Sequence, residues 1–392
     1  MDNGDETELI SGFCECWRET LNWQDNDFLE PTILDVWNLQ SKAKQKYFDL
    51  GQIKLIEISE SDFELTGDGK TGLSPNERRH LQISKVHNHD KSCWIDRFNL
   101  KQEMSSWIFP LHFIDFETAM TAIPFNCDKH PYEGIAFQFS HHIIRENGQV
   151  EHVGQYLNAE PGIFPNFDFI RALKHELEND NGSIFRYAMH ENSYLRTIHD
   201  QLPENSHEIA DSDELCSFID SITEYKGLST KAPKICGFRN MIDMCELVKR
   251  YFYDPSMKGS NSIKKVLPAV LNSSRFLQDK YFKPIYGSPS GIPSLNYQNK
   301  IWVEFQDGHV RDPYKLLRKM FEDMPEGDIE LASDSEMINE GGAAATAYAR
   351  MQSEDMSVYE RLELSRSLLE YCELDTLAMV MLYEGWKDMI GS

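Results

Sequence analysis

The feature that most constrains this chain is an alternation, between residues 107 and 253, of short apolar segments with segments of helical spacing. The apolar segments have the composition of strands, and they are WIFPLHFIDFET (107–118), GIAFQFSHHII (134–144), VEHVGQYL (150–157) and SIFRYAMH (183–190). Apolar residues recur at helical intervals over 164–179 and 242–253. Strands that alternate with helices predict an α/β domain, in which helices cover a sheet.

The segments on either side of this alternation predict further parts of the chain. Residues 1–100 form an N-terminal helical appendage, with helical patterns at 6–20 and 29–50, a strand-like IKLIEI at 53–58 and a helix opened by Pro75. Residues 101–392 form the main domain, which we expect to carry an insertion at about 286–345 that serves as a lid or substrate gate. This insertion includes a strand-like IWVEFQ, a DG turn and an acidic segment, and two helices follow it.

The composition favours a protein that stays in the cytoplasm. Hydrophobic residues make up 41% of the chain, and no stretch of about 18 apolar residues predicts a membrane span. The start, MDNGDETELI, is acidic and resembles neither a secretory signal nor a basic transit peptide. We therefore expect the eight cysteines to be reduced thiols. Apart from Cys14 and Cys16 they show no close spacing, which argues against a zinc site.

The formal net charge of −25 limits how the chain could bind nucleic acid. Proteins that grip nucleic acid by neutralising phosphates are usually basic, so such a substrate would need bound cations or a local basic patch. Residues 256–286 offer one candidate, because their only acid is Asp279 and their basic residues are Lys258, Lys264, Lys265, Arg275, Lys280 and Lys283. The alternative is that these lysines cover a solvated helix face.

Two acids stand at the end of the first apolar segment. Asp115 and Glu117 are two residues apart, so on a strand they share one face. Two desolvated carboxylates on one face are costly unless a cation lies between them, and Mg²⁺ prefers oxygen ligands of this kind. The alternative is a strand end that reaches solvent, with both acids hydrated.

Other acids belong to segments far away along the chain. Tyr371 and Asp375 are four residues apart on the last helix and share an apolar face, although Asp375 could also cap or pair locally and Tyr371 could be a core residue. Glu191 follows the strand-like segment 183–190 and is either a loop residue or part of a site. Asp243 is either an N-cap or a site neighbour.

In chain order these segments resemble the DEDD, or DnaQ-like, 3′–5′ exonuclease superfamily, which has the ribonuclease H-like fold. Its D-x-E motif is matched by Asp115 and Glu117, and the Y-x-x-x-D motif of its tyrosine subclass by Tyr371 and Asp375. The second motif normally supplies an Asp, and the best match is Glu191, a departure from the pattern. A closer resemblance is to an uncharacterised bacterial family of unknown function built on that core, through FIDFETAMTAIPF, GIAFQFSHH, GSNSIKKVLPAV, AYARMQ and YCELDTLAMV.

The resemblance implies a mixed sheet flanked by helices and two Mg²⁺ or Mn²⁺ ions that hydrolyse a phosphodiester bond. Asp115, Glu117, Glu191 and Asp375 would hold the ions, and Tyr371 would orient or help to deprotonate the attacking water. The substrate would be single-stranded nucleic acid or a 3′ end. The expected substrate-binding residues are Phe116, Thr118, Lys258, Ser262, Lys264 and Lys265. Loop aromatics Tyr286 and Tyr297, like Phe116, either stack on terminal bases or pack in the protein.

Members of that family often carry an upstream RecB-type nuclease domain, sometimes with an iron–sulfur cluster. We expect no cluster here, because Cys14 and Cys16 are two thiols and such a cluster needs four. A partner nuclease domain or subunit is consistent with the resemblance. His141 and His142 are adjacent on a strand and point to opposite faces, so we expect structural roles for both.

Two functions follow as expectations. The first is a metal-dependent 3′–5′ exonuclease acting on DNA or RNA, or a structure-specific endonuclease variant of it. The second is a catalytically degenerate exonuclease fold that binds nucleic acid or a partner protein, which the acidic charge and the departure at Glu191 favour.

Overall fold

The computed structural model describes residues 11–205, 207, 209–226, 233–319, 338 and 341–391. The chain divides into two compact units. The first comprises Met1–Ile95 and Lys249–Asn261, and the second comprises Asp96–Val248 and Ser262–Ser392. The first boundary lies close to the predicted one near residue 100, but residues 249–261 had been assigned to the main domain. This segment joins the first unit because β9 (Phe252–Tyr253) pairs with β1 (Trp94–Ile95), and because the buried guanidinium of Arg78 donates to the Phe252 carbonyl at 2.8 Å.

The first unit is helical, with α1 (Gly12–Leu21), α2 (Ser41–Asp49) and α3 (Pro75–His87). The predicted helix at Pro75 is confirmed, and a capping box between Ser74 and Glu77 begins it. The predicted strand at 53–58 is wrong. Leu55–Glu57 instead form the 3₁₀ helix η3, because the Glu57 carboxylate accepts hydrogen bonds from the backbone N–H groups of Ile53 and Lys54 and stabilises a turn.

The second unit is built on a five-stranded mixed sheet with the order β4-β3-β2-β5-β8. Its strands are β2 (Leu111–Met120), β3 (Gly134–Ile144), β4 (Val150–Leu157), β5 (Ile184–Arg186) and β8 (Ile242–Asp243). The central strand β2 is antiparallel to β3 and parallel to β5. The predicted α/β class is thereby confirmed, and β3 and β4 coincide with the predicted segments.

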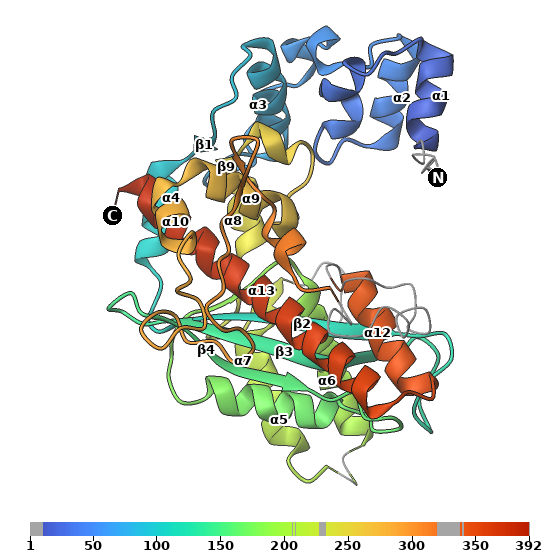
Figure 1. Ribbon diagram of the computed structural model, residues 1–392, viewed down its shortest axis with the longest axis vertical. Helices are drawn as coiled ribbons and strands as arrows, with labels where there is room; N and C mark the ends of the chain where they lie inside the picture. The colour runs from blue at the N-terminus through green and yellow to red at the C-terminus, as the bar shows by residue number, and fades with distance from the viewer. Residues whose placement is uncertain are drawn as a thin grey trace, which may run out of the picture. The chain divides into compact units, whose positions relative to one another are not determined.

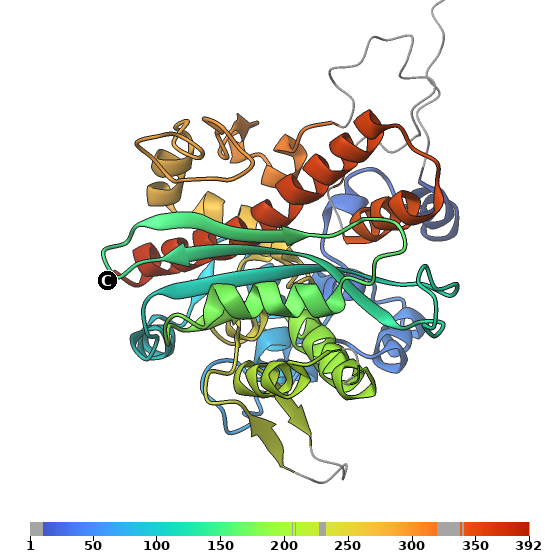
Figure 2. The same ribbon diagram turned by 90° about the horizontal axis from the view of Figure 1, so that it is seen from below.

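Helices cover both faces of this sheet (Figures 1 and 2). One face packs against α5 (Asn166–Leu177), α6 (His190–Glu204) and α7 (Ser212–Ile222), and the apolar core between them includes Ile114, Phe116 and Phe139. The other face packs against the long C-terminal helix α13 (Val358–Ile390). Because side chains alternate along a strand, the residues of β2 that neighbour Phe116, namely Asp115 and Glu117, face α13.

The second unit also includes shorter elements, although the last residues of α8 belong to the first unit. They are α4 (Arg97–Ser105), β6 (Glu224–Lys226), β7 (Lys234–Cys236), α8 (Met244–Tyr251), α9 (Ile263–Ser273), α10 (Arg275–Tyr281), η6 (Pro313–Leu316) and α12 (Gly341–Ser353). The predicted DG turn is confirmed, since Asp307 and Gly308 have φ of 52° and 80° and join β10 (Phe305–Gln306) to β11 (His309–Val310). Most of the predicted acidic segment at 322–340 lies outside the described residues. None of the described helices has the length and apolarity needed to cross a bilayer.

Candidate metal centre

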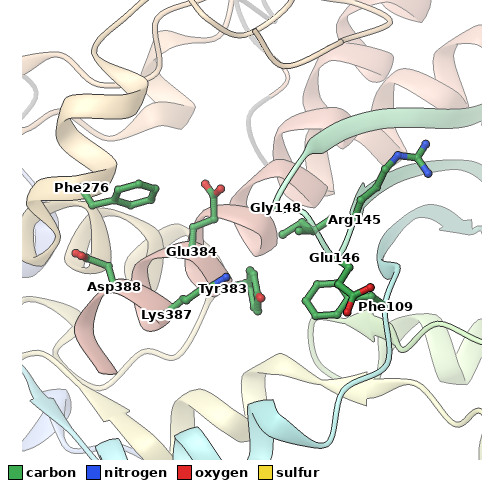
Figure 3. A pocket seen from close by; sticks show the side chains of 10 residues that line it. Phe109, Arg145, Glu146, Gly148, Phe276, Tyr383, Glu384, Lys387 and Asp388 are labelled. Atoms are coloured by element: carbon green, nitrogen blue, oxygen red, sulfur yellow. The ribbon is translucent and has the colours of Figure 1, made fainter. Parts of the chain in front are cut away.

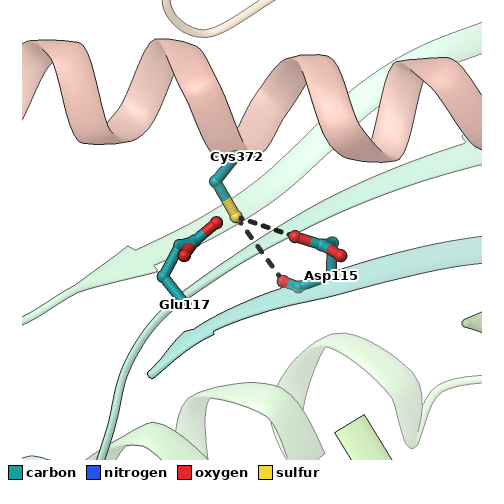
Figure 4. Close-up of side chains that lie close together, drawn as sticks. All are labelled: Asp115, Glu117 and Cys372. Carbon is teal, nitrogen blue, oxygen red and sulfur yellow. Dashed lines mark hydrogen bonds between the residues drawn. The ribbon is translucent and has the colours of Figure 1, made fainter. Parts of the chain in front are cut away.

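Three side chains converge where β2 passes under α13. Asp115 and Glu117 extend from β2, and Cys372 extends from α13 to between them (Figure 4). Each offers one ligand atom, and these three atoms all lie within 4.8 Å of one another. Glu117 is 5% exposed and Cys372 is completely buried, whereas Asp115 is half-buried, so the cluster is partly removed from water.

Two further carboxylates act on this cluster. Asp375 lies one helical turn after Tyr371 on α13, and Glu191 stands in the first turn of α6, the helix that follows β5. Glu191 is 1% exposed, and its Oε2 has no hydrogen-bond partner among the described residues. A buried polar atom with no partner is expensive, so Glu191 Oε2 is a donor atom available to a ligand.

The electrostatics show how closely these acids are coupled. Burial, and then the charges of Asp375, Glu191 and Glu117, raise the pKa of Asp115 well above its ordinary value. Burial and the charge of Asp375 likewise raise the pKa of Glu117. Burial also raises the pKa of Glu191 to about 8 and that of Asp375 to about 6. The raised pKa values mean that the ionised form of each of these four carboxyl groups is unfavourable in the bare protein. A divalent cation bound among them would stabilise the ionised forms.

Two tyrosines and a lysine lie beside Asp375. The Tyr314 hydroxyl, on η6, donates to Asp375 Oδ1, and a hydrogen bond from Tyr371 also lowers the pKa of Asp375. Lys264 Nζ, on α9, lies 5.1 Å from the ring centroid of Tyr314 and 5.0 Å from that of Tyr371. Its positive charge lowers the pKa of both Glu117 and Asp375. Of the predicted basic patch, Lys264 is thus the residue that the structure places at the acids.

Replacing Tyr314 with Phe tests the hydrogen bond to Asp375. Because a buried, ionised carboxylate loses a donor, we expect the free energy of unfolding at pH 7.5, measured by urea denaturation, to fall by about 1.5–3 kcal/mol. Tyr348→Phe is the matched control. Tyr348 is fully buried, and its hydroxyl has no hydrogen-bond partner among the described residues, so its loss should be nearly neutral. Equal losses in the two variants would contradict the assignment.

An ion-pair network on the neighbouring strands influences the pKa of Glu191. Arg186 is 2% exposed on β5, with its guanidinium 3.0 Å from Asp243 on β8 and 3.6 Å from Glu224. Asp243 also caps α8 by accepting a hydrogen bond from Cys245 N at 2.9 Å. Arg186 lowers the pKa of Glu191 and Asp243 raises it. The N-cap reading of Asp243 is confirmed, and its charge also acts on Glu191.

Arg186→Met is expected to destabilise the fold by about 3 kcal/mol, because it leaves the largely buried Asp243 without its cation, whereas Glu224 keeps its ion pair with Lys234. Arg171→Met is the control. Arg171 is 40% exposed, pairs with Asp168 and Asp211, and should cost less than about 1 kcal/mol. Urea denaturation of both variants measures the difference. A loss for Arg186→Met no larger than that for Arg171→Met would show that the network contributes little.

The predicted substrate-binding residues fall into different environments. Thr118 lies next to Glu117, and its hydroxyl is 3.0 Å from His190 Nε2. Ser262 and Lys265 are exposed at the start of α9, whereas Lys258 belongs to the first unit, where its Nζ lies 3.9 Å from Asp35. In the rest of the basic segment, Arg275 pairs with Asp279 and Lys280 with Glu384.

The stacking role considered for three aromatic residues is wrong. Phe116 is 3% exposed and packs edge-to-face on Phe169, because alternation along β2 turns it away from the acids. Tyr286 and Tyr297 are also buried. The Tyr286 hydroxyl donates to Glu373, and the Tyr297 hydroxyl donates to the Glu370 carbonyl at 2.8 Å. These aromatic residues pack within the second unit and present no ring to a base.

The two adjacent histidines of β3 have structural contacts, as the sequence predicts. His141 Nδ1 lies 3.0 Å from Glu176. His142 Nδ1 lies 2.7 Å from the Thr376 hydroxyl of α13, and its Nε2 lies 2.8 Å from the Tyr286 hydroxyl. His142 therefore helps to set the position of α13 on the sheet.

Sequence reasoning missed Cys372 and Tyr314. Cys372 could have been found, because it precedes Asp375 by three residues and so shares its helical face. Tyr314 carries no such signal, since its contact with Asp375 joins residues 61 positions apart.

A separate cavity lies near the C-terminal end of α13 (Figure 3). It has a volume of about 320 Å³ and is lined by Phe109, Ile144, Arg145, Glu146, Gly148, Phe276, Tyr383, Glu384, Lys387 and Asp388. None of the predicted site residues lines this cavity, and two of its acids are already bonded, Glu384 to Lys280 and Asp388 to Ser274. The predicted site residues therefore lie away from this cavity.

Comparison with known families adds one finding. Residues 112–262 match a domain of unknown function, DUF2779. The matched segment contains Asp115, Glu117 and Glu191, and it ends before Lys264, Tyr371 and Asp375. Searches of curated proteins and of solved structures found no match. Over that segment the chain is similar to an uncharacterised family, in agreement with the coarser part of the resemblance seen in the sequence.

Proposed function

We propose that this protein is a metal-dependent nuclease that removes nucleotides from the 3′ ends of nucleic acid. One observation carries the proposal: Asp115 and Glu117 lie together on β2, the charges of Glu191 on α6 and Asp375 on α13 act on them, the pKa of each of the four acids is raised, and one oxygen of Glu191 has no hydrogen-bond partner among the described residues. Such an arrangement is unfavourable for a bare protein and favourable for one that binds divalent cations.

The donor set fits Mg²⁺ or Mn²⁺. Asp115, Glu117, Glu191 and Asp375 offer carboxylate oxygens, the ligands that these hard cations prefer. When bound, a pair of such ions stabilises the attacking and leaving oxygens of a phosphodiester bond.

Tyr371 is the residue best placed to act on the attacking water. It is buried, and burial together with the charge of Asp375 raises the pKa of its phenol far above its ordinary value. The hydroxyl therefore stays protonated at neutral pH, so Tyr371 would orient the water through its hydroxyl oxygen and would not act as a base. The positive charge of Lys264, beside the Tyr371 ring, favours a phosphate there.

The fold supports the finer assignment to a ribonuclease H-like exonuclease. The D-x-E pair lies on the central strand of a mixed sheet, the Y-x-x-x-D pair lies on the last helix, and that helix packs over the acidic strand. This is the relation that the resemblance to the tyrosine subclass of DEDD exonucleases implies. The departure at Glu191 is compatible with it, because the longer side chain still acts electrostatically on Asp115.

A specific observation favours the second candidate, a non-catalytic binding module. Tyr314 already donates a hydrogen bond to Asp375, so this proposed metal ligand is partly satisfied without a metal. The net charge of −25 also disfavours strong binding of a nucleic-acid substrate. Such a module would bind nucleic acid or a partner without cleaving it.

The deciding experiment incubates the purified protein with 5′-labelled linear single-stranded DNA and RNA in Mn²⁺, in Mg²⁺ and in EDTA. We expect metal-dependent shortening from the 3′ end and no cutting of a circular single strand. Cleavage of circles would indicate an endonuclease. Metal-dependent binding without any cleavage would indicate the module and overturn the nuclease proposal.

A further inference from the structure

One possible ligand of the cluster, the thiol of Cys372, is not a carboxylate. Cys372 is completely buried, and its Sγ lies 3.8 Å from Asp115 Oδ2 and 3.6 Å from the Asp115 carbonyl oxygen (Figure 4). A thiol is a weak hydrogen-bond donor, so these contacts contribute little by themselves. The resemblance to DEDD exonucleases implies carboxylate ligands only, and it therefore leaves this sulfur unexplained.

The geometry allows this sulfur to share a cation with the carboxylates. Two ligand atoms on one Zn²⁺-like ion can stand at most about 4.4 Å apart, the sum of a Zn–S and a Zn–O bond. The distance of 3.8 Å from Sγ to Asp115 Oδ2 lies within this limit. One oxygen of Glu117 completes a group of three donors within 4.8 Å of one another, so a modest inward shift of these side chains would bring all three onto one ion.

A second observation also points to a ligand at this place. Glu191 is 1% exposed, and its Oε2 has no hydrogen-bond partner among the described residues. Its charge acts on both Asp115 and Glu117, so it lies close to the same cluster. An unsatisfied carboxylate oxygen close to two acids that also contact a buried thiol is an arrangement expected of a metal site with mixed oxygen and sulfur donors.

We propose that Cys372 supplies a sulfur ligand to the cation held by Asp115 and Glu117. Sulfur donors select borderline and soft ions, so this site should prefer Co²⁺ or Zn²⁺ to Mg²⁺. Binding releases the thiol proton to solvent and leaves a thiolate on the ion. The inference rests on the metal centre of the proposed function and requires no substrate.

Co²⁺ titration followed by absorption spectroscopy tests this ligand directly, because a thiolate on Co²⁺ gives a sulfur-to-metal charge-transfer band and a carboxylate does not. We expect the band in the wild-type protein and in Cys245→Ser, which removes another buried cysteine. We expect it to be absent in Cys372→Ser. Calorimetry should show Co²⁺ affinity reduced about tenfold or more in Cys372→Ser, with Mg²⁺ affinity changed less.

The outcomes separate this inference from the proposed function. Co²⁺ binding without the band, or a band that persists in Cys372→Ser, overturns the sulfur ligand and leaves the carboxylate centre intact. Failure of both Co²⁺ and Mn²⁺ to bind, measured by calorimetry and by thermal shift, overturns both proposals. Cys372→Ala provides a second test if the serine variant unfolds, and circular dichroism checks that each variant is folded.

Discussion

Asp115→Asn should reduce metal-dependent cleavage of a single-stranded 3′ end by at least about 10³-fold. A lost metal ligand removes several kcal/mol of transition-state charge stabilisation, and each 1.4 kcal/mol corresponds to a factor of ten in rate. Asp375→Asn should have a comparable effect, because it removes a carboxylate of the same centre from α13. Both rates are measured from the shortening of labelled oligonucleotides at saturating Mn²⁺.

The controls for this prediction distinguish chemistry from folding. Without metal, Asp115→Asn should be at least as stable as the wild type, since it removes one of several mutually repelling buried charges. Asp200→Asn is a matched control on α6, because the side chain of Asp200 is 82% exposed, and its activity should be unchanged. Wild-type rates in Asp115→Asn, with the same metal dependence, would remove this cluster from the mechanism.

Glu191→Gln should stabilise the metal-free protein by an amount that grows with pH. The pKa of Glu191 is raised from 4.5 to about 8 in the folded state, so folding binds a proton that the unfolded chain releases. The wild type therefore loses stability as pH rises from about 4.5 to about 8, and the variant has no such group. The advantage of Glu191→Gln should grow over this window, with an upper limit on the order of 1.4 kcal/mol per unit of pKa shift.

Urea denaturation in EDTA at several pH values between 5 and 8 measures this difference. Saturating Mn²⁺ should reverse it, because the cation binds the ionised carboxylates and stabilises the folded wild type. Glu214→Gln serves as the control, since the side chain of Glu214 is 66% exposed and its replacement should give no such trend. A difference between wild type and Glu191→Gln that does not vary with pH would show that Glu191 is not held in a shared acidic site.

Two strands of the second unit could be predicted from the pattern of apolar residues in the sequence. The run of apolar residues at 134–144 and the alternation at 150–157 each coincide with a strand, because a mostly buried strand leaves a strong local pattern. The strand predicted at residues 53–58 is wrong because the local pattern there is misleading. That segment has an alternating pattern of apolar residues, but hydrogen bonds from backbone N–H groups to the Glu57 carboxylate favour a turn. The alternation of apolar residues carries no information about such side-chain hydrogen bonds.

The sequence by itself determined the α/β class and paired Asp115 with Glu117 and Tyr371 with Asp375, because i, i+2 spacing on a strand and i, i+4 spacing on a helix place side chains on one face. Only the tertiary structure decided what surrounds those acids. It buried Glu191 with one carboxylate oxygen, Oε2, that has no hydrogen-bond partner among the described residues, and it brought Cys372 beside Asp115 and Tyr314 onto Asp375. These contacts join segments far apart along the chain, and no local spacing encodes how a helix packs on a sheet.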